Sequence, residues 1–287
     1  MREAGKLLAF LMLAAGLMLA MRQASAAELN AETEKAWKEY VGSARAQMNA
    51  RLGPTACFLW AEDNAERMRR LRDGEILVEP ADEQTPRRIP GGLIHHWIGA
   101  IFVPGATLVQ VLAIQRDYDR YSTYYPSIVR SRLVASDGPT DRVATIERHQ
   151  AMFSRIALDA DVSTTYADVS QKRAYSISST IRLQEIQNYG GRGQHEMEPV
   201  APKAYLWQLS TIGRYEERDG GVYLELEGMA LSRDIPPALR WLVDPFVRQA
   251  SAGAMAASLR QTRDAVMNDR AGSAGKPPPG ALTFRAP

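Results

Sequence analysis

The spacing of apolar residues along the chain changes from a helical period to a period of two and back again. Asn30 to Leu52 has Glu residues in its first turn and stops at Gly53-Pro54, which predicts a helix capped by Asn30. Thr107 precedes apolar residues at i, i+3 and i+4 from Leu108, which predicts a second, shorter helix. Both predicted helices precede the long middle part of the chain, where the period changes.

Apolar and polar residues alternate from Ser127 to Leu231, which is typical of strands with one buried face. Turn signals such as Asp137-Gly138 and Asp219-Gly220-Gly221 separate most of these strands, so consecutive strands should form hairpins in an antiparallel sheet. Together with two strands that precede this region, the predicted strands are 75–79, 93–103, 128–135, 142–149, 162–169, 174–187, 205–217 and 222–231.

The pattern becomes helical again after Pro236-Pro237 and predicts the longest helix of the chain, which ends near Val266. Pro245 lies inside this helix and is expected to kink it or to break its first turns. The tail at residues 268–287 is rich in Gly, Pro and Ala and is expected to be disordered.

The first 26 residues are predicted to be a secretory signal peptide. Arg2 and Lys6 precede 15 apolar residues from Leu7 to Met21, and Ala24-Ser25-Ala26 is a small-residue cleavage site. A membrane anchor is the alternative, but a helix needs roughly 20 apolar residues to cross a bilayer. We therefore expect an exported protein, periplasmic or secreted, with no transmembrane segment after cleavage.

Composition and charge narrow the classes of partner. The 287 residues are 45% hydrophobic and 24% charged, with 35 Lys and Arg against 33 Asp and Glu. Because the predicted signal peptide holds three basic residues and one acidic residue, the mature chain has 32 of each and is formally neutral. Nucleic-acid binding needs clustered basic charge and is not expected. Cys57 is the single cysteine, so it cannot form an intrachain disulfide, and we expect it to be a small buried apolar residue rather than a nucleophile.

The last predicted hairpin indicates which side chains share a face of the sheet. The loop can be Asp219-Gly220 or Gly220-Gly221. In both cases the odd-numbered residues of 205–217 share a face with the even-numbered residues of 222–231. The opposite face is predicted to be exposed, with a surface pair between Arg214 and Glu225 that contributes about 0 to 1 kcal/mol. The less favoured alternative makes Glu225 and Glu227 paired catalytic carboxylates. The buried face carries Trp207, Leu209, Thr211, Gly213, Tyr215, Leu224, Leu226, Gly228 and Ala230.

Small residues on two facing surfaces raise the question of a cavity. The final helix presents Ala250, Gly253, Ala254 and Ala257 to a sheet face that also holds glycines. Such surfaces either approach closely or enclose a void, and the sequence leaves both alternatives open. A void would be an apolar pocket suited to a lipid or an aromatic ligand. Its predicted ligand-binding residues are Trp207, Leu209, Thr211, Gly213, Tyr215, Leu224, Leu226, Gly228, Phe246, Ala250 and Ala254.

Several landmarks follow one another in a recognisable order. A strand ends at Pro104-Gly105, the segment DYDRYSTYYP follows at Asp117 to Pro126, and antiparallel strands lead to a long helix after Pro236-Pro237. This order resembles the START-like, helix-grip (SRPBCC) superfamily. Trp97 to Val134 in particular is similar to the opening of polyketide-cyclase and coenzyme-Q-binding type domains. The resemblance covers roughly Glu75 to Val266.

The resemblance implies an α+β fold in which a curved antiparallel sheet wraps around a long C-terminal helix. It divides the chain into the signal peptide at 1–26, an N-terminal helical extension at 27–74, a START-like ligand-binding domain at 75–267 and the tail at 268–287. Members of the superfamily bind lipids, sterols, quinones or polyketides, and some are cyclases or hydrolases. They share no universal catalytic motif, so the resemblance assigns no catalytic residue.

Motifs for a metal, a cofactor or a nucleophile do not occur in the sequence. His95 and His96 are adjacent on a predicted strand and therefore point to opposite faces. His and Cys occur in no zinc-binding spacing, and there is no nucleophile-elbow, dinucleotide-binding or P-loop string. We predict no metal, no cofactor and no catalytic residue.

The resulting hypothesis is an exported START-like protein that binds a hydrophobic small molecule, such as a lipid, a quinone or a polyketide-like compound. Carriage or sequestration is favoured over catalysis. One rival is a cyclase, dehydratase or hydrolase, with Asp117, Tyr121, His149 and Arg182 as its candidate residues. Another is an envelope protein-interaction module with a closed core and an exposed helix at residues 30–52.

Overall fold

The computed structural model describes residues 29–151, 154–198, 201, 204–234 and 237–274. Its helices are α2 (Ala31–Ala50), α3 (Ala65–Arg72), α4 (Leu108–Arg116), α5 (Tyr121–Tyr124) and α6 (Pro237–Ala274), with 3-10 helices η1 (Trp60–Asp63) and η2 (Tyr118–Arg120). Its strands are β1 (Leu77–Pro80), β2 (Arg87–Ile89), β3 (Gly92–Pro104), β4 (Ile128–Asp137), β5 (Thr140–Ala151), β6 (Ser154–Ser170), β7 (Arg173–Gln187), β8 (His195–Glu196), β9 (Leu206–Arg218) and β10 (Gly221–Arg233). The predicted signal peptide lies outside the described residues.

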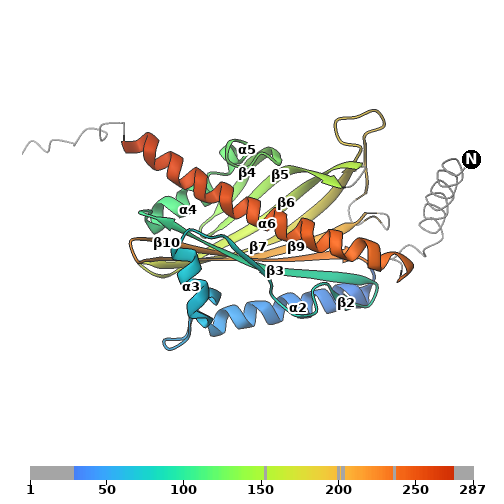
Figure 1. The fold of residues 1–287 in the computed structure, drawn as a ribbon. Coiled ribbons are helices and arrows are strands. Elements are labelled where there is room, and N and C mark those ends of the chain that lie inside the picture. Colours follow the sequence, from blue (N-terminus) through green and yellow to red (C-terminus); the bar gives the residue numbers. More distant parts are fainter. Residues whose placement is uncertain (1–28, 152–153, 199–200, 202–203, 235–236, 275–287) are drawn as a thin grey trace, which may run out of the picture.

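All the described strands belong to one antiparallel sheet, in the order β1-β3-β10-β9-β7-β6-β5-β4. The short strands β2 and β8, which the sequence did not predict, pair with β3 and β7. The sheet is curved, and α6 and α2 lie on opposite sides of it (Figure 1). The predicted α+β fold, a curved antiparallel sheet around a long C-terminal helix, is therefore confirmed.

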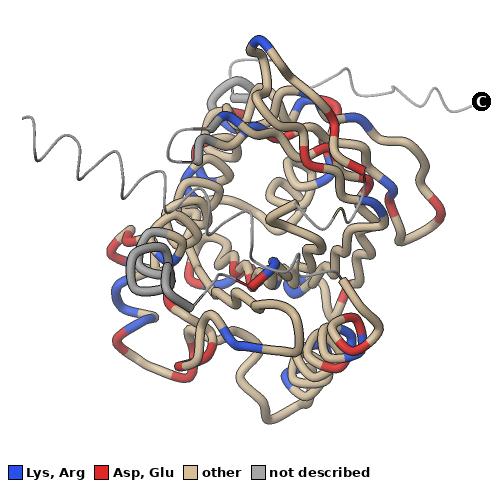
Figure 2. The backbone as a smooth tube through the Cα atoms, turned by 90° about the vertical axis from the view of Figure 1, so that its right-hand side faces the viewer, with Lys and Arg blue, Asp and Glu red and all other residues tan. Residues whose placement is uncertain are grey.

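Charged residues of both signs are spread over the molecule, as Figure 2 shows.

None of the helices in the described ranges is long and apolar enough to cross a membrane.

Close packing holds α6 against strands β3 and β10. A Cβ atom at Gly99 of β3 would lie 2.7 Å from Leu259 Cδ1, and one at Gly228 of β10 would lie 3.1 Å from Met255 Cε. The absence of side chains at these glycines thus lets the helix approach the sheet. Close approach, one of the two alternatives left open by the sequence, therefore applies where Met255 and Leu259 of α6 meet β3 and β10.

The N-terminal segment covers the other face of the sheet. Asn30 caps α2 by accepting a hydrogen bond from the Thr33 backbone N–H at 2.8 Å, as predicted. The buried residues of α2 form one core with the sheet, and the participants include Trp37, Val41, Ala44, Met48, Ile212, Tyr223 and Met229. The prediction that this face is exposed was wrong, because strand alternation does not reveal that a distant helix covers the second face.

A β-bulge near the start of β9 changes the face of one predicted residue. Leu231 pairs with Gln208 and Ser232 pairs with Leu206, so Trp207 is the extra residue between them. A bulge breaks the alternation of side chains. Trp207 is 1% exposed and lies in the core on the α2 side. Its predicted place on the face toward α6 was therefore wrong.

The final helix is longer than the sequence indicated. α6 runs without a break through Pro245 and continues to Ala274. Residues 268–274, predicted as part of a disordered tail, are helical. Arg270 Nη1 donates a hydrogen bond to the Pro104 carbonyl at 2.8 Å, and Val266 is buried in the core, so these contacts hold the last turns against the sheet. The tail beyond Ala274 lies outside the described residues.

Candidate functional site

A cavity of about 430 Å³ lies between α6 and the sheet, on the side away from α2. Strands β4 to β7, β9 and β10, the end of α4 and the η2–α5 turn complete its wall. The lining residues are Gln115, Tyr118, Tyr121, Tyr125, Ser127, Ile128, Ser131, Val143, Thr145, Glu147, His149, Val162, Thr164, Tyr166, Ser176, Ser178, Thr211, Tyr215, Leu226, Ala254, Ala257, Ser258 and Gln261.

The wall combines carbon surface with many hydroxyl groups. Of its 23 residues, five are tyrosines, eight are serines or threonines, and six are aliphatic. This composition differs from the apolar pocket expected from the sequence. Ring faces and methyl groups alternate with polar atoms, so the wall suits a ligand that is itself both apolar and oxygenated.

A group of tyrosines is held around the backbone of Gln115 at one end of the cavity. Tyr121 and Tyr166 both donate hydrogen bonds to the Gln115 carbonyl oxygen, at 2.6 and 3.0 Å. The Tyr118 hydroxyl lies 3.1 Å from Asp141 Oδ2 and from Tyr166 Oη. Burial raises the pKa of Tyr118, Tyr121 and Tyr166, so these phenols stay neutral at physiological pH.

Most hydroxyls of the wall already have a hydrogen-bond partner within the protein, and some of them pair with one another. Ser176 Oγ lies 3.0 Å from Tyr215 Oη, and Thr164 Oγ1 lies 2.8 Å from Ser178 Oγ. These pairs leave few donors or acceptors for a ligand. Within the described part of the chain, the lining side chains that make no hydrogen bond include Ser131, Thr211, Ser258 and Gln261.

One acid-base pair lies toward the outside of the cavity. Glu147 and His149 alternate on β5, so both face the cavity, and His149 Nε2 lies 3.7 Å from Glu147 Oε2. Ser127 Oγ donates a hydrogen bond to Glu147 Oε1 at 2.9 Å. The side chains of Glu147 and His149 are 38% and 35% exposed, which places the pair at the mouth.

The order of the elements, the curvature of the sheet around α6 and the cavity between them decide the fold. The chain has a START-like, helix-grip fold. No family model matches the sequence, and no curated protein matches it.

Solved structures with a similar fold have low sequence identity to this chain. A STAR-related lipid transfer protein from Xanthomonas axonopodis is 14% identical, with 67% of this chain and 93% of that one covered and a TM-score of 0.45. Human STARD10 is 8% identical, with 79% and 90% covered and a TM-score of 0.42. An aromatase/cyclase from a Streptomyces species is 13% identical, with 64% and 99% covered and a TM-score of 0.41. These likenesses concern the fold alone.

Four of the predicted ligand-binding residues line the cavity of the helix-grip fold: Thr211, Tyr215, Leu226 and Ala254. Thr211 and Tyr215 belong to β9, Leu226 belongs to β10, and Ala254 lies opposite them on α6. The hairpin register that linked odd residues of β9 with even residues of β10 is present at these positions. The contribution of these four residues to ligand binding stays a prediction.

Three other predicted residues fill space beside the cavity. A Cβ at Gly213 would lie 2.5 Å from Tyr215 Oη, so the glycine makes room for the tyrosine hydroxyl. Gly228 accommodates Met255, as described above. Leu224 is 4% exposed and packs in the core that contains Ile101.

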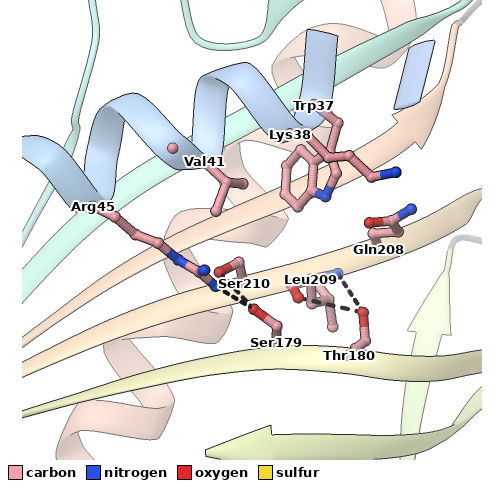
Figure 3. Close-up of a pocket in the computed structure, with 10 residues that line it drawn as sticks. Trp37, Lys38, Val41, Arg45, Ser179, Thr180, Gln208, Leu209 and Ser210 are labelled. Carbon is pink, nitrogen blue, oxygen red and sulfur yellow. Dashed lines mark hydrogen bonds between the residues drawn. The ribbon is translucent and has the colours of Figure 1, made fainter. Parts of the chain in front are cut away.

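Three of the remaining predicted residues, Trp207, Leu209 and Ala250, do not line the cavity. Leu209 instead lines a separate groove next to α2 (Figure 3), and Ala250 is exposed on α6. Trp207 lies on the α2 side of the sheet because of the β-bulge. The side chain of Phe246 lies outside the described residues.

The structure separates the residues nominated for catalysis. Tyr121 and His149 both line the cavity. Asp117 instead accepts hydrogen bonds from Tyr124 at 2.5 Å and Arg120 at 3.1 Å. Arg182 is bound to Asp159 and Asp161 of β6, and neither carboxylate lines the cavity. The four candidates therefore do not converge on one point.

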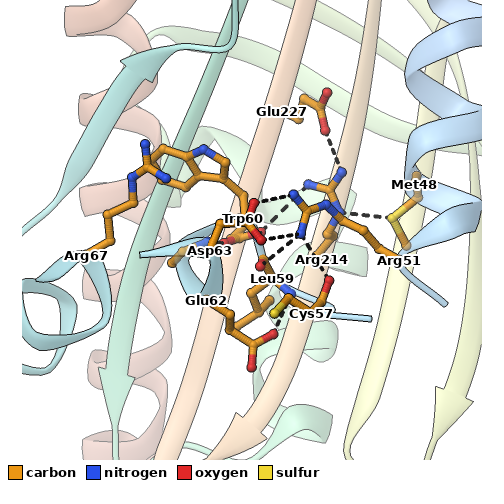
Figure 4. A network of polar contacts seen from close by, with 12 residues as sticks. Met48, Arg51, Cys57, Leu59, Trp60, Glu62, Asp63, Arg67, Arg214 and Glu227 are labelled. Carbon is orange, nitrogen blue, oxygen red and sulfur yellow. Dashed lines mark hydrogen bonds and ion pairs between the residues drawn. The ribbon is translucent and has the colours of Figure 1, made fainter. Parts of the chain in front are cut away.

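Glu225 and Glu227 belong to a buried network on the α2 side, which Figure 4 shows around Arg214. Arg214 Nη2 lies 2.6 Å from Glu227 Oε2, and its Nη1 lies 3.7 Å from Glu225 Oε2. Glu225 also accepts hydrogen bonds from the backbone N–H groups of Trp60 and Ala61, each at 2.8 Å. The side chains of Arg214, Glu225 and Glu227 are 3%, 0% and 8% exposed, so the predicted surface pair is a buried one.

Histidines of β3 follow the predicted alternation but both are buried. His95 Nε2 lies 2.9 Å from Ser232 Oγ, and His96 Nε2 lies 2.9 Å from Glu227 Oε1. Burial lowers the pKa of His95 to about 4, so its imidazole is neutral at physiological pH. Within the described ranges, no group of three or more His, Cys, Asp or Glu side chains could hold a metal ion.

Apart from Tyr121 and His149, the sequence did not indicate the cavity-lining residues on β4 to β7 and on the tyrosine turn. Val162, Thr164 and Tyr166 alternate on β6, and Ser176 and Ser178 alternate on β7. This alternation was visible in the sequence. It did not indicate the inward face, because small hydroxyl residues occupy both faces of these strands.

Proposed function

We propose that this protein binds a small molecule containing both ring or chain carbon and oxygen groups, and carries or sequesters it after export from the cytoplasm. The cavity of about 430 Å³ between α6 and the sheet is the single observation that carries the proposal. Its volume falls within the range of roughly 300 to 1,000 Å³ common for small-molecule sites. The protein-interaction alternative requires a closed core, so this cavity supports ligand binding instead.

The wall favours a quinone or a polyketide-like compound over a saturated acyl chain. The neutral phenols of Tyr118, Tyr121 and Tyr166 offer no charge to an ionic head group at that end. The ring surfaces suit a flat ligand. Four lining side chains make no hydrogen bond to the described residues and are free to meet a ligand oxygen: Ser131, Thr211, Ser258 and Gln261.

Extraction and titration test this proposal together. The purified mature protein is extracted with organic solvent and the extract is examined by mass spectrometry. The ligand-free protein is then titrated with menadione, an aromatic quinone, and with palmitate, a saturated acyl chain. We expect an oxygenated ring compound in the extract and tighter binding of menadione. An empty extract with no binding of either probe contradicts the proposal.

A second candidate function rests on Glu147 and His149 at the mouth. A carboxylate and an imidazole 3.7 Å apart could remove and return a proton, as a cyclase or dehydratase requires. Turnover of the extracted compound, lost in His149→Ala while its binding persists, supports this enzyme. No turnover by the native protein favours carriage, whereas unchanged turnover in His149→Ala excludes His149 as the acid or base.

Export is tested separately. We expect intact mass measurement of the native protein to show a chain that begins at Ala27. A mass that includes residues 1–26 contradicts cleavage.

A further inference from the structure

A second cavity, of about 300 Å³, lies between α2 and strands β7 and β9. We call it the α2 groove; its wall includes Trp37, Val41, Arg45, Ser179 and Ser210. None of its lining residues lines the cavity next to α6. Figure 3 shows the Arg45 side chain reaching from α2 toward Ser179, with Trp37 at the other end of the groove.

The guanidinium of Arg45 is held in place by a chain of hydroxyls. Arg45 Nη2 donates a hydrogen bond to Ser179 Oγ at 2.8 Å. Ser210 Oγ donates its proton to the Ser178 carbonyl at 2.9 Å. In the hydrogen bond of 3.2 Å between Ser179 Oγ and Ser210 Oγ, the donor must therefore be Ser179. The protons of Ser179 and Ser210 are therefore both used, so at this end of the groove Arg45 supplies the N–H donors left for a ligand.

Arg45 has no negatively charged partner within the described ranges. It forms no ion pair among the described residues, its Nε is buried without a hydrogen bond, and its Nη1 makes no hydrogen bond to them either. The groove has no carboxylate in its wall, and Lys38 at its rim is already paired with Glu34 at 3.2 Å. A half-buried guanidinium without a counter-ion is unfavourable, because it has lost hydration and gained no opposite charge.

We propose that the α2 groove binds a small oxyanion, a carboxylate or a phosphate, through Arg45. Guanidinium groups recognise both anions through paired N–H donors. Trp37 and Val41 form the apolar part of the wall, so an anion that carries a ring or a short chain fills the groove better than a bare one. This site is independent of the ligand proposed for the cavity next to α6.

Calorimetric titration of the mature protein at low ionic strength tests this site with three probes. Benzoate carries a ring and a carboxylate, inorganic phosphate carries the anion alone, and methyl benzoate carries the ring without charge. We expect benzoate or phosphate to bind and methyl benzoate to bind far more weakly. Benzoate binding without phosphate binding identifies a carboxylate site, and the reverse identifies a phosphate site.

Variants decide whether Arg45 is responsible. Arg45→Gln should weaken anion binding by at least about tenfold, because a hydrogen bond to a charged group is lost. Arg69→Gln is the matched control, because Arg69 is exposed and paired with Glu66 and Asp73, and it should leave binding unchanged. The anion should also raise the melting temperature of the parent protein but not that of Arg45→Gln. No binding of either anion, or equal binding by Arg45→Gln, overturns the proposal.

Discussion

Replacing Arg214 by methionine tests the buried network that joins the N-terminal segment to the sheet. In the native protein Arg214 stands between Glu225 and Glu227, and its Nε lies 2.9 Å from Met48 Sδ of α2. Arg214→Met leaves the two carboxyl groups in place without their cation. Removing one partner of a buried ion pair typically costs about 3 to 5 kcal/mol. We therefore expect Arg214→Met to lower the free energy of unfolding by about that amount at neutral pH.

The loss of stability in Arg214→Met should increase as the pH rises. Burial raises the pKa of Glu225 to about 7, above the ordinary value of 4.5 that applies in the unfolded chain. Burial also opposes ionisation of Glu227, but hydrogen bonding to His96 and the charge of Arg214 outweigh it and lower the pKa of Glu227. Without Arg214 both pKa values rise. The folded variant then holds protons that its unfolded chain releases, so its stability falls as pH rises above about 4.5.

Urea unfolding followed by tryptophan fluorescence measures this effect. The parent and Arg214→Met are compared at about pH 5 and about pH 8, and the deficit should be larger at the higher pH. Arg192→Met, in an exposed loop, is the control and should change stability by less than about 0.5 kcal/mol. If Arg214→Met is less stable than the parent by under about 1 kcal/mol, or by the same amount at both pH values, Arg214 does not stabilise the buried carboxylates as described.

Three further predictions concern packing, capping and the cavity. Gly99→Ala should lower the free energy of unfolding by about 1 to 3 kcal/mol, as measured by urea unfolding. Gly228→Ala should lower it less, because the flexible end of Met255 can move away from a Cβ at that position. Asn30→Ala should cost about 1 kcal/mol in the same assay, since it removes the cap of α2; no change would mean that the cap is dispensable. Ala257→Phe should fill the cavity and weaken menadione binding by at least about tenfold, whereas Gly253→Ala, with open space around it, should not. Equal binding by both variants would place the ligand elsewhere.

The fold could be predicted largely because turn residues and strand alternation act locally. Asp219 and Gly220 adopt positive φ angles, 57° and 76°, and so fix the β9–β10 hairpin and its register. That register placed Thr211 and Tyr215 on the face of β9 that lines the cavity. The Asn30 cap and the helix after Thr107 likewise depend on residues close in sequence.

The parts that could not be predicted depend on contacts between distant segments. Glu225 was read as exposed because nothing in β10 reveals that Trp60 and Ala61 will donate hydrogen bonds to it. Trp207 was placed on the wrong face because a bulge breaks the period without a sequence signal. The hydroxyl-rich wall was missed because β6 and β7 carry small polar residues on both faces, so burial could not be assigned from alternation.

A crystal structure of the mature protein grown with menadione tests the central claim most directly. We expect the quinone between α6 and strands β6, β7 and β9, with its ring against the tyrosines and a carbonyl oxygen within hydrogen-bond reach of Thr211 or Gln261. An empty or collapsed cavity, with the quinone absent or bound at the surface, would contradict it.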